Sequence, residues 1–130
     1  MHVSKNDIPT LIDTFGAVAR QKTDFGDATG CAEIGAEHFL LAEGTDITPL
    51  LKGLKDDLCQ SPHWGYLVDG ELTVRYADGS AENLKSGDLF YLPPGHTVSA
   101  NKPTEFVLFS PQKEHTFVLE HMKKGHEESL

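Results

Sequence analysis

Short apolar and β-branched segments divide the second half of the chain, and turn signals separate them. Asp69-Gly70 and Asp78-Gly79 are strong signals for tight hairpin turns, and Ser86-Gly87-Asp88 marks a third turn. Short strands separated by glycine-containing turns predict an antiparallel sandwich or barrel. The strands are expected at residues 64–68, 72–76, 83–85, 89–92, 97–100 and 105–109.

The first half of the chain and its C-terminal end give other signals. Asp7 can cap a short helix over residues 8–12, and residues 32–42 favour one or two short strands. Residues 49–58 predict a loop with one helical turn. A closing helix is expected after Ser110 as its cap, with Pro111 in its first turn and Gly125 at its end.

Length and composition indicate a single globular domain. The chain has 130 residues, of which 38% are hydrophobic. We expect an N-terminal extension at residues 1–30, a β-barrel at 31–111, and a helix and tail at 112–130. No apolar run is long enough for a membrane span or a signal peptide, so a cytoplasmic protein is expected. Cys31 and Cys59 would remain thiols there.

The charge balance excludes one class of partner. Eleven Lys and Arg stand against twenty Asp and Glu, which gives a formal net charge of -9 at pH 7. Nucleic acids and anionic membranes attract positively charged surfaces, so neither is an expected partner.

Residues 87–95 read Gly, five residues, Pro, Pro and Gly, and His96 follows directly. With this motif, the segment from Gly44 to Pro111 resembles the cupin superfamily. In the second motif of that family, Gly, five residues, Pro, any residue and Gly are followed by a His three positions later. Residues 87–95 match the first part in full, whereas the histidine is His96 and the usual slot holds Val98. A displacement of two residues along a strand keeps the side chain on the same face. The resemblance implies an all-β fold: a cupin-like double-stranded β-helix, or jelly-roll barrel, with the N-terminal extension and C-terminal helix added.

The first cupin motif differs in identity but keeps residue types that bind metals. With Gly70 as its last glycine, the usual Glu slot holds His63, and the two His slots hold Cys59 and Asp57. The stretches Pro-His-Trp-Gly-Tyr and Pro-Pro-Gly-His are similar to a subset of small, single-domain RmlC-like cupins.

The candidate metal ligands are therefore His63, His96 and Cys59, with Asp57 as a fourth ligand or an orienting acceptor. One thiolate and two imidazoles favour zinc, whereas iron, nickel or manganese are common in the three-His, one-Glu sites of the family. The alternative is that no metal binds, that Cys59 is a core thiol and that both histidines form hydrogen bonds inside the fold.

Two functions follow from the resemblance. The first is binding of a small molecule, with a metal-dependent isomerase, lyase or dioxygenase acting on a small oxygenated metabolite as its enzymatic form. The second is a non-catalytic, metal-free ligand-binding or sensing module. The resemblance leaves open whether the chain is an enzyme.

Other residues have alternative roles. Gly65 leaves space for a ligand or marks a bend. Trp64, Tyr66 and Val68 would lie on the outer face, which suggests a homodimer. Tyr91 could reach the cavity, although most strand tyrosines only pack. His115 and His121 are expected to be surface or packing residues of the closing helix. Glu37 or His38 could point inward, and strand alternation does not choose between them.

Overall fold

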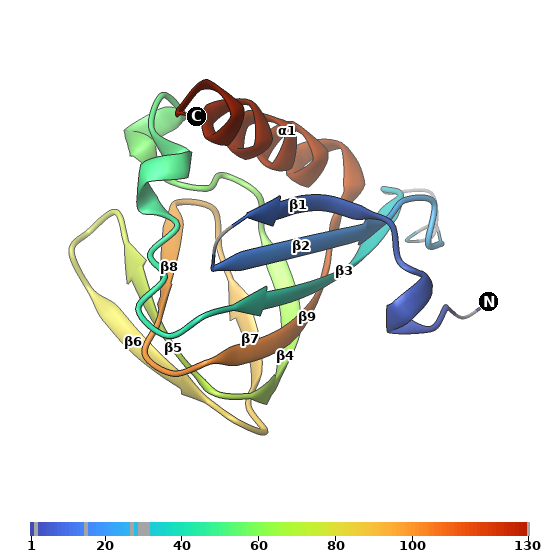
Figure 1. Cartoon of the computed structure of the whole chain (residues 1–130), viewed down its shortest axis with the longest axis horizontal. Helices are drawn as coiled ribbons and strands as arrows, with labels where there is room; N and C mark the ends of the chain where they lie inside the picture. Colours follow the sequence, from blue (N-terminus) through green and yellow to red (C-terminus); the bar gives the residue numbers. More distant parts are fainter. Residues whose placement is uncertain (2, 15, 27, 29–31, 130) are drawn as a thin grey trace.

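The computed structural model of the chain contains two antiparallel β-sheets and a C-terminal helix, and it describes residues 1–130 except 2, 15, 27, 29–31 and 130 (Figure 1). The larger sheet has the order β1 (Thr10–Thr14), β2 (Ala17–Lys22), β3 (Ile34–Leu41), β9 (Thr104–Pro111), β4 (His63–Asp69) and β7 (Leu89–Leu92). The smaller sheet has the order β6 (Ala81–Lys85), β5 (Glu71–Tyr76) and β8 (His96–Ala100). The helical segments are η1 (Lys5–Asp7), η2 (Thr48–Leu51), η3 (Lys55–Asp57) and α1 (Gln112–Ser129).

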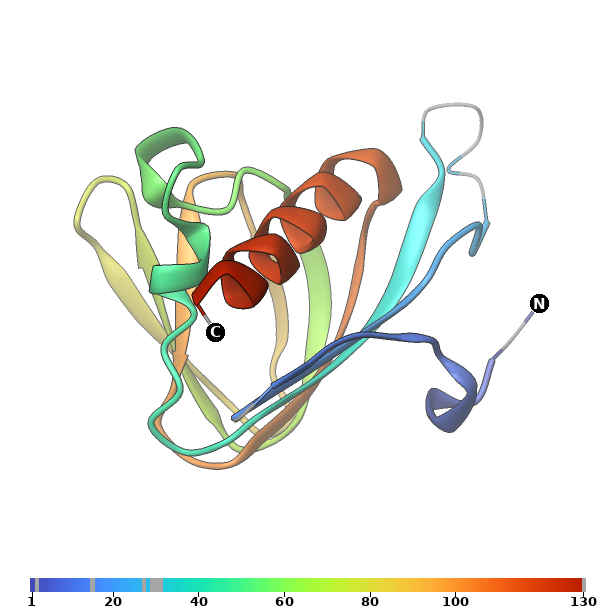
Figure 2. The same ribbon diagram turned by 45° about the horizontal axis from the view of Figure 1, so that its top comes forward.

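The expected all-β jelly-roll class is confirmed, although the strands form two sheets and do not close into one hydrogen-bonded barrel. Figure 2 shows the sheets spreading apart toward one end, where α1 lies across the opening. This helix packs against η2, β1, β3 and β9. The C-terminal helix therefore closes the interior of the sandwich.

Alternating burial explains why the second half of the chain forms these strands. In β7, Phe90 and Leu92 are buried, whereas Leu89 and Tyr91 are exposed. Alternate side chains of a strand point to opposite faces, so an alternating sequence places one face in the core. The core combines residues from both sheets with Val118, Leu119 and Met122 of α1.

The N-terminal segment differs from the sequence interpretation. The prediction of a helix over residues 8–12 was wrong, because Thr10–Thr14 is β1 and pairs with β2. β2 in turn pairs with β3, so the expected extension at residues 1–30 includes two strands of the larger sheet. Pairing with a neighbouring strand satisfies the backbone polar groups of residues whose local sequence alone favoured a helical turn.

The predicted beginning and end of the closing helix were also wrong. Ser110 and Pro111 are the last residues of β9, and α1 begins at Gln112. The helix continues through Gly125 to Ser129 instead of ending at that glycine. Ser110 is therefore not a helix cap, and its hydroxyl is free to bond elsewhere.

Among the described residues, none of the helices combines the length and the apolar character needed to cross a bilayer.

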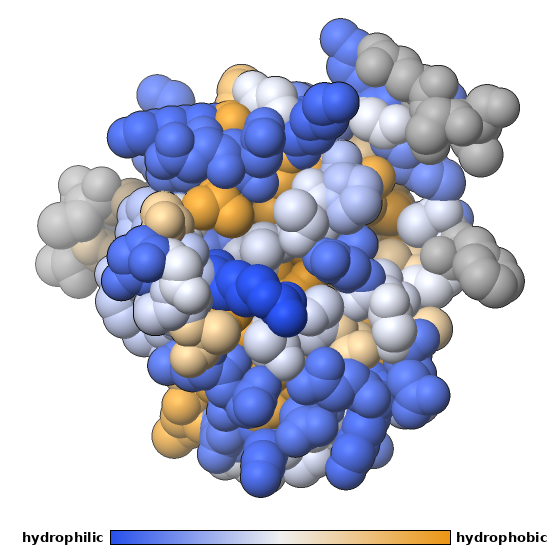
Figure 3. Space-filling view, turned by 90° about the vertical axis from the view of Figure 1, so that its left-hand side faces the viewer, coloured by the Kyte–Doolittle hydropathy of each residue, from blue (hydrophilic) through white to orange (hydrophobic). Residues whose placement is uncertain are grey.

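Hydrophilic side chains cover much of the lower part of the face shown in Figure 3. The exposed residues of β6 include Glu82, Asn83 and Lys85. The exposed apolar side chains Trp64, Tyr66 and Tyr91 lie instead on β4 and β7 of the larger sheet.

Gly65 neither lines the cavity nor leaves room for a ligand, so the ligand-space interpretation was wrong. A Cβ atom at this position would lie 2.5 Å from Cζ of Phe90, 2.5 Å from the carbonyl oxygen of Val107 and 2.8 Å from Cδ2 of Leu108. The missing side chain lets β7 and β9 pack closely on both sides of β4.

Gly65→Ala is expected to lower the free energy of unfolding by about 3 kcal/mol, because a backbone oxygen cannot move aside for the added methyl group. Urea denaturation measures this change. Gly125→Ala is the matched control, since among the described residues no atom outside its own stretch of helix backbone lies within 4 Å of its Cβ position. This control is expected to stabilise α1 by up to about 1 kcal/mol. Equal stability of Gly65→Ala and the parent chain would contradict the packing account.

Candidate metal centre

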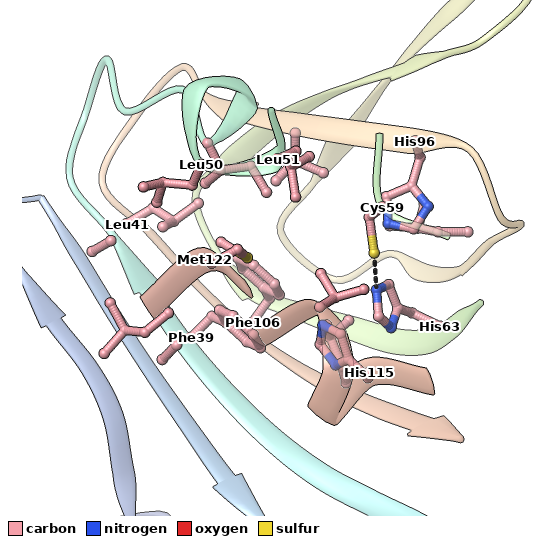
Figure 4. A pocket seen from close by; sticks show the side chains of 18 residues that line it. Phe39, Leu41, Leu50, Leu51, Cys59, His63, His96, Phe106, His115 and Met122 are labelled. Carbon is pink, nitrogen blue, oxygen red and sulfur yellow. Dashed lines mark hydrogen bonds between the residues drawn. The ribbon is translucent and has the colours of Figure 1, made fainter. Parts of the chain in front are cut away.

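Cys59 and His96 are held beside each other by the backbone. The amide of Cys59 donates to the carbonyl oxygen of His96 at 2.8 Å, and the amide of His96 donates back to Cys59 at 3.2 Å. This isolated bridge attaches the loop after η3 to the first residue of β8. His63, the first residue of β4, points into the same space (Figure 4).

The potential ligand atoms of Cys59, His63 and His96 all lie within 4.8 Å of one another. Sγ of Cys59 is 3.6 Å from Nε2 of His63. The two imidazole rings have centroids 5.0 Å apart and meet edge to face. All three side chains are buried. Two histidines and a cysteine from separate segments therefore converge at one point.

Hydrogen bonds at Nδ1 orient the two imidazoles so that Nε2 of each is unprotonated, and Nε2 of His63 accepts from the Cys59 thiol at 3.6 Å. Nδ1 of His96 lies 2.7 Å from the carbonyl oxygen of Pro93, which can only accept, so this nitrogen carries the proton. Nδ1 of His63 lies 2.6 Å from Oγ of Ser110, whose hydroxyl donates to Oε1 of Glu37. Ser110 therefore accepts from His63. A fixed Nδ1–H and an unprotonated Nε2 form the arrangement found in metal-binding histidines.

Burial keeps both imidazoles neutral near pH 7. It lowers the pKa of His63 well below its ordinary value, and the nearby imidazoles of His115 and His96 lower it further. Burial also lowers the pKa of His96 to about 4, against the opposing effect of its hydrogen bond to Pro93. Burial raises the pKa of Cys59 to about 12, so its thiol loses a proton at neutral pH only when a cation stabilises the thiolate.

The metal-free protein is expected to lose stability in acid. A histidine whose pKa is lowered by folding binds its proton more tightly in the unfolded chain. Its full contribution is therefore present above pH 6.5 and is lost as the pH falls toward the folded value. For His96 the change from 6.5 to about 4 corresponds to roughly 3 kcal/mol. Between pH 7 and pH 5, which is still above the folded pKa, about 2 kcal/mol of this contribution should be lost. Urea denaturation at the two pH values measures the loss, and equal stability at both values would contradict it.

Glu37 and His115 extend the site beyond the metal ligands predicted from the sequence. Nδ1 of His115 donates to Oε2 of Glu37, and the His115 ring lies 4.2 Å, between centroids, from that of His63. Glu37 also accepts from Ser110 and, at 3.4 Å, from Gln21. The carboxyl group of Glu37 thus connects the strand β3 to α1 and, through Ser110, to His63.

The position of His115 in α1 was a sequence signal that could have identified it as a buried residue of the site. His115, Val118 and Met122 follow the three- and four-residue spacing of one helix face, and all three are buried. The surface or packing interpretation placed His115 away from any site, whereas the structure places it against His63. Glu37 and His38 are both buried, and Nε2 of His38 pairs with Glu105 at 2.7 Å on the other side of the strand.

Two other expected cavity residues lie elsewhere. Asp57 is exposed, and its Oδ1 accepts from the amide of Gly53 at 2.9 Å. The structure therefore does not bring Asp57 to the three ligand atoms, because the chain turns at η3 with a positive φ at this residue. The Tyr91 side chain is exposed on the outer face, so of its two possible roles the one in the cavity is not realised. Cys31 lies outside the described residues.

The converging side chains lie at one end of an interior cavity of about 50 Å³. In Figure 4, His63, His96, Cys59 and His115 group together, whereas Leu41, Phe39 and Leu50 lie toward the opposite end. A zinc ion with three protein ligands keeps one coordination position for a water or a substrate. The donor set therefore fits zinc, and the adjoining cavity provides the space for a fourth ligand.

Neither a family model nor the sequence of a curated protein matches this chain. Solved structures do match its fold. An RmlC-like cupin from Shewanella frigidimarina is 18% identical, with a TM-score of 0.60 over 88% of this chain and 93% of that one. A variant of oxalate decarboxylase from Bacillus subtilis is 20% identical, with a TM-score of 0.57 over 84% of this chain and 28% of that one. Ectoine synthase from P. lautus is 17% identical, with a TM-score of 0.54 over 77% and 67% of the two chains.

These similarities show that the chain has the fold of the cupin superfamily, which confirms the expectation from the sequence. The chain spans 28% of the length of the oxalate decarboxylase that it matches. Another structure of the Bacillus subtilis enzyme, 22% identical, describes its Mn(II) centres. The narrower resemblance to the Pro-Pro-Gly-His subset stays a prediction.

Proposed function

We propose that this protein is a metal-binding cupin that holds a small molecule beside a divalent ion, with zinc as the favoured metal. The observation that carries the proposal is the convergence of Cys59, His63 and His96 within 4.8 Å at the polar end of a cavity. Both histidines keep an unprotonated Nε2, which is the form that coordinates a metal, because each Nδ1 donates a hydrogen bond. The Mn(II) centres of the structurally similar oxalate decarboxylase support a metal in this fold.

The side chains around the site would have two roles, which are to hold the ion and to orient its ligands. His63 and His96 would hold the ion, with Cys59 as a soft third ligand that favours zinc over manganese. Ser110 and the carbonyl oxygen of Pro93 fix the two rings, and Glu37 fixes Ser110 in turn. A bound metal would polarise an oxygen of the ligand. The apolar lining restricts water around that oxygen.

If the protein is an enzyme, we propose an isomerase, lyase or dioxygenase acting on a small oxygenated metabolite. The single free coordination position and the small cavity support a substrate of this size. We also propose a cytoplasmic location, because the Cys59 thiol needed for the site would stay reduced there.

The second candidate function is a metal-free module that binds or senses a ligand. One observation favours it: burial raises the pKa of Cys59 to about 12, so the thiol stays protonated without a metal. In that case Sγ–H and the two imidazoles would form a hydrogen-bonded wall of the cavity.

Metal titration separates the two functions. Protein purified without an affinity tag is stripped with a chelator, loaded with zinc, and assayed for zinc per chain after removal of free metal. We expect about one ion per chain. The cobalt-loaded protein should show a thiolate-to-metal absorption band that Cys59→Ser removes. A zinc content near zero would rule out the metal-dependent function and leave the metal-free module.

We further propose that the protein is a homodimer that pairs through the outer face of β9, β4 and β7. Trp64 is 51% exposed, Leu89 83% and Tyr91 50%. Trp64 and Tyr91 lie opposite each other, with ring centroids 5.3 Å apart. An exposed apolar patch of this kind is typical of a protein interface, and a second copy carries the complementary apolar face.

Trp64→Glu is expected to weaken the dimer by at least about 30-fold, because a buried interface tryptophan is a frequent energetic centre. Light scattering across a concentration series measures the change in mass. Ala81→Glu on the exposed strand β6 is the matched control and should leave the dimer intact. A parent chain that remains monomeric at high concentration would contradict the homodimer.

A further inference from the structure

The cavity beside the candidate metal centre has two chemically different ends. Four of its lining residues are the polar group Cys59, His63, His96 and His115. The other lining residues are all apolar, and they include Ala17, Leu41, Leu50 and Met122. Figure 4 shows Leu41 and Leu50 on the side away from the histidines. A ligand placed here meets a coordinating end and a hydrocarbon end.

The size of the cavity limits the ligand. Its volume of about 50 Å³ is room for about four water-sized groups, if each needs about 10–15 Å³. A compact molecule of about four or five non-hydrogen atoms therefore fits without a large rearrangement. Met122 and Leu50 at the apolar end are flexible side chains that can adjust to a small difference in length.

The charges around the cavity select against a second anionic group. No lysine or arginine is among the described residues that line it. A charged side chain beside its histidines is the carboxyl of Glu37, which binds His115 and, through Ser110, connects to His63. A carboxylate pushed into the apolar end would lose its hydration with no donor to replace the lost water.

We propose that the ligand is a short-chain molecule with one polar, metal-binding group and an aliphatic end, and that small dianions are excluded. This proposal rests on the metal-binding function and specifies the substrate class of the same site. The polar group occupies the free coordination position of the metal, and the aliphatic end packs toward Leu41 and Ala17 of the paired strands β3 and β2. Burial of each added methylene group then increases the affinity of the ligand until the cavity is full.

Propionate and malonate test the proposal, because they share a three-carbon chain and differ by a methyl group against a carboxylate. Zinc-loaded full-length protein, with its metal content confirmed first, is titrated with each compound by calorimetry. We expect propionate to bind at least about tenfold more tightly than malonate. Propionate should also bind about fourfold more tightly than acetate, because it buries one more methylene group.

Ala17→Leu tests the direction of the ligand. Ala17 lines the cavity and pairs with Leu41 across β2 and β3, so a larger side chain there fills the apolar end. The variant is expected to lose the fourfold advantage of propionate over acetate, and its zinc content is measured before the titrations. Ala81→Leu on the exposed strand β6 is the matched control and should change neither compound.

The two proposals fail in different ways. A chain that takes up no zinc overturns the metal-binding function, and the substrate class falls with it. A zinc-loaded chain that binds malonate as tightly as propionate overturns the substrate class alone. The comparison of propionate with acetate needs only the parent chain, so the result does not depend on whether Ala17→Leu folds.

Discussion

Replacing His96 with alanine is expected to weaken zinc binding by more than about 100-fold while the protein remains folded. The loss of a residue that only orients a metal ligand typically costs 10–100-fold in affinity, and the loss of a ligand should cost more. His96 presents Nε2 to the site because its Nδ1 donates to Pro93. Competition against a zinc-binding dye measures the affinity, and thermal unfolding of the metal-free protein measures stability.

His121→Ala is the matched control for this prediction. His121 lies in α1, and its Nε2 contacts the carbonyl oxygen of Lys52 at 2.7 Å, outside the group of three ligand atoms. This variant should bind zinc as the parent chain does. An unchanged zinc affinity in His96→Ala, together with a large loss of stability, would show that His96 is a structural histidine.

Glu37→Gln is expected to lower the free energy of unfolding by about 3 kcal/mol. The carboxyl group is fully buried, and three donors converge on it: Ser110, His115 and Gln21. An amide of the same shape must point its NH₂ group at one of these donors, which leaves a buried polar group unsatisfied. Chemical denaturation of the metal-free protein measures the change.

The same substitution should also weaken zinc binding by about 10- to 100-fold, because Glu37 holds the Ser110 hydroxyl that orients His63. Glu82→Gln is the matched control. Glu82 is exposed on β6 and accepts only a hydrogen bond from the Tyr76 hydroxyl among the described contacts. Its effect on stability should stay within about 0.5 kcal/mol. A similarly small effect of Glu37→Gln would contradict the assigned role.

Sequence signals predicted the strands of the second half of the chain, because alternation and tight turns involve residues that are close together in the sequence. Alternation and the turn at Asp69-Gly70 place β4 and β5 within one residue of the expected boundaries. The N-terminal strands were missed for the opposite reason. β1 and β2 are strands because they pair with each other and with β3, which is a contact between distant segments. The spacing of Ile8, Leu11 and Ile12 carries no information on that pairing.

For the candidate site, too, the sequence predicted some residues correctly and misplaced others. The cupin motif and the period of two along a strand placed His96 inward, and the slot count in the first motif selected Cys59 and His63. The slot count also selected Asp57, which the turn at η3 directs to the surface. His115 was assigned to packing, because the sequence gives its helix face but not what that face covers.

By itself, the sequence determined the antiparallel architecture, because alternation and tight turns act over a few residues. The resemblance to the cupin motifs implied that His63 and His96 face inward. Only the tertiary structure decided that α1 covers the opening between the sheets and brings His115 against His63. It also decided that Glu37 and Ser110, 73 residues apart, meet by hydrogen bonding inside the fold. These contacts depend on how elements pack in space, and a linear pattern of polar and apolar residues does not encode which faces meet.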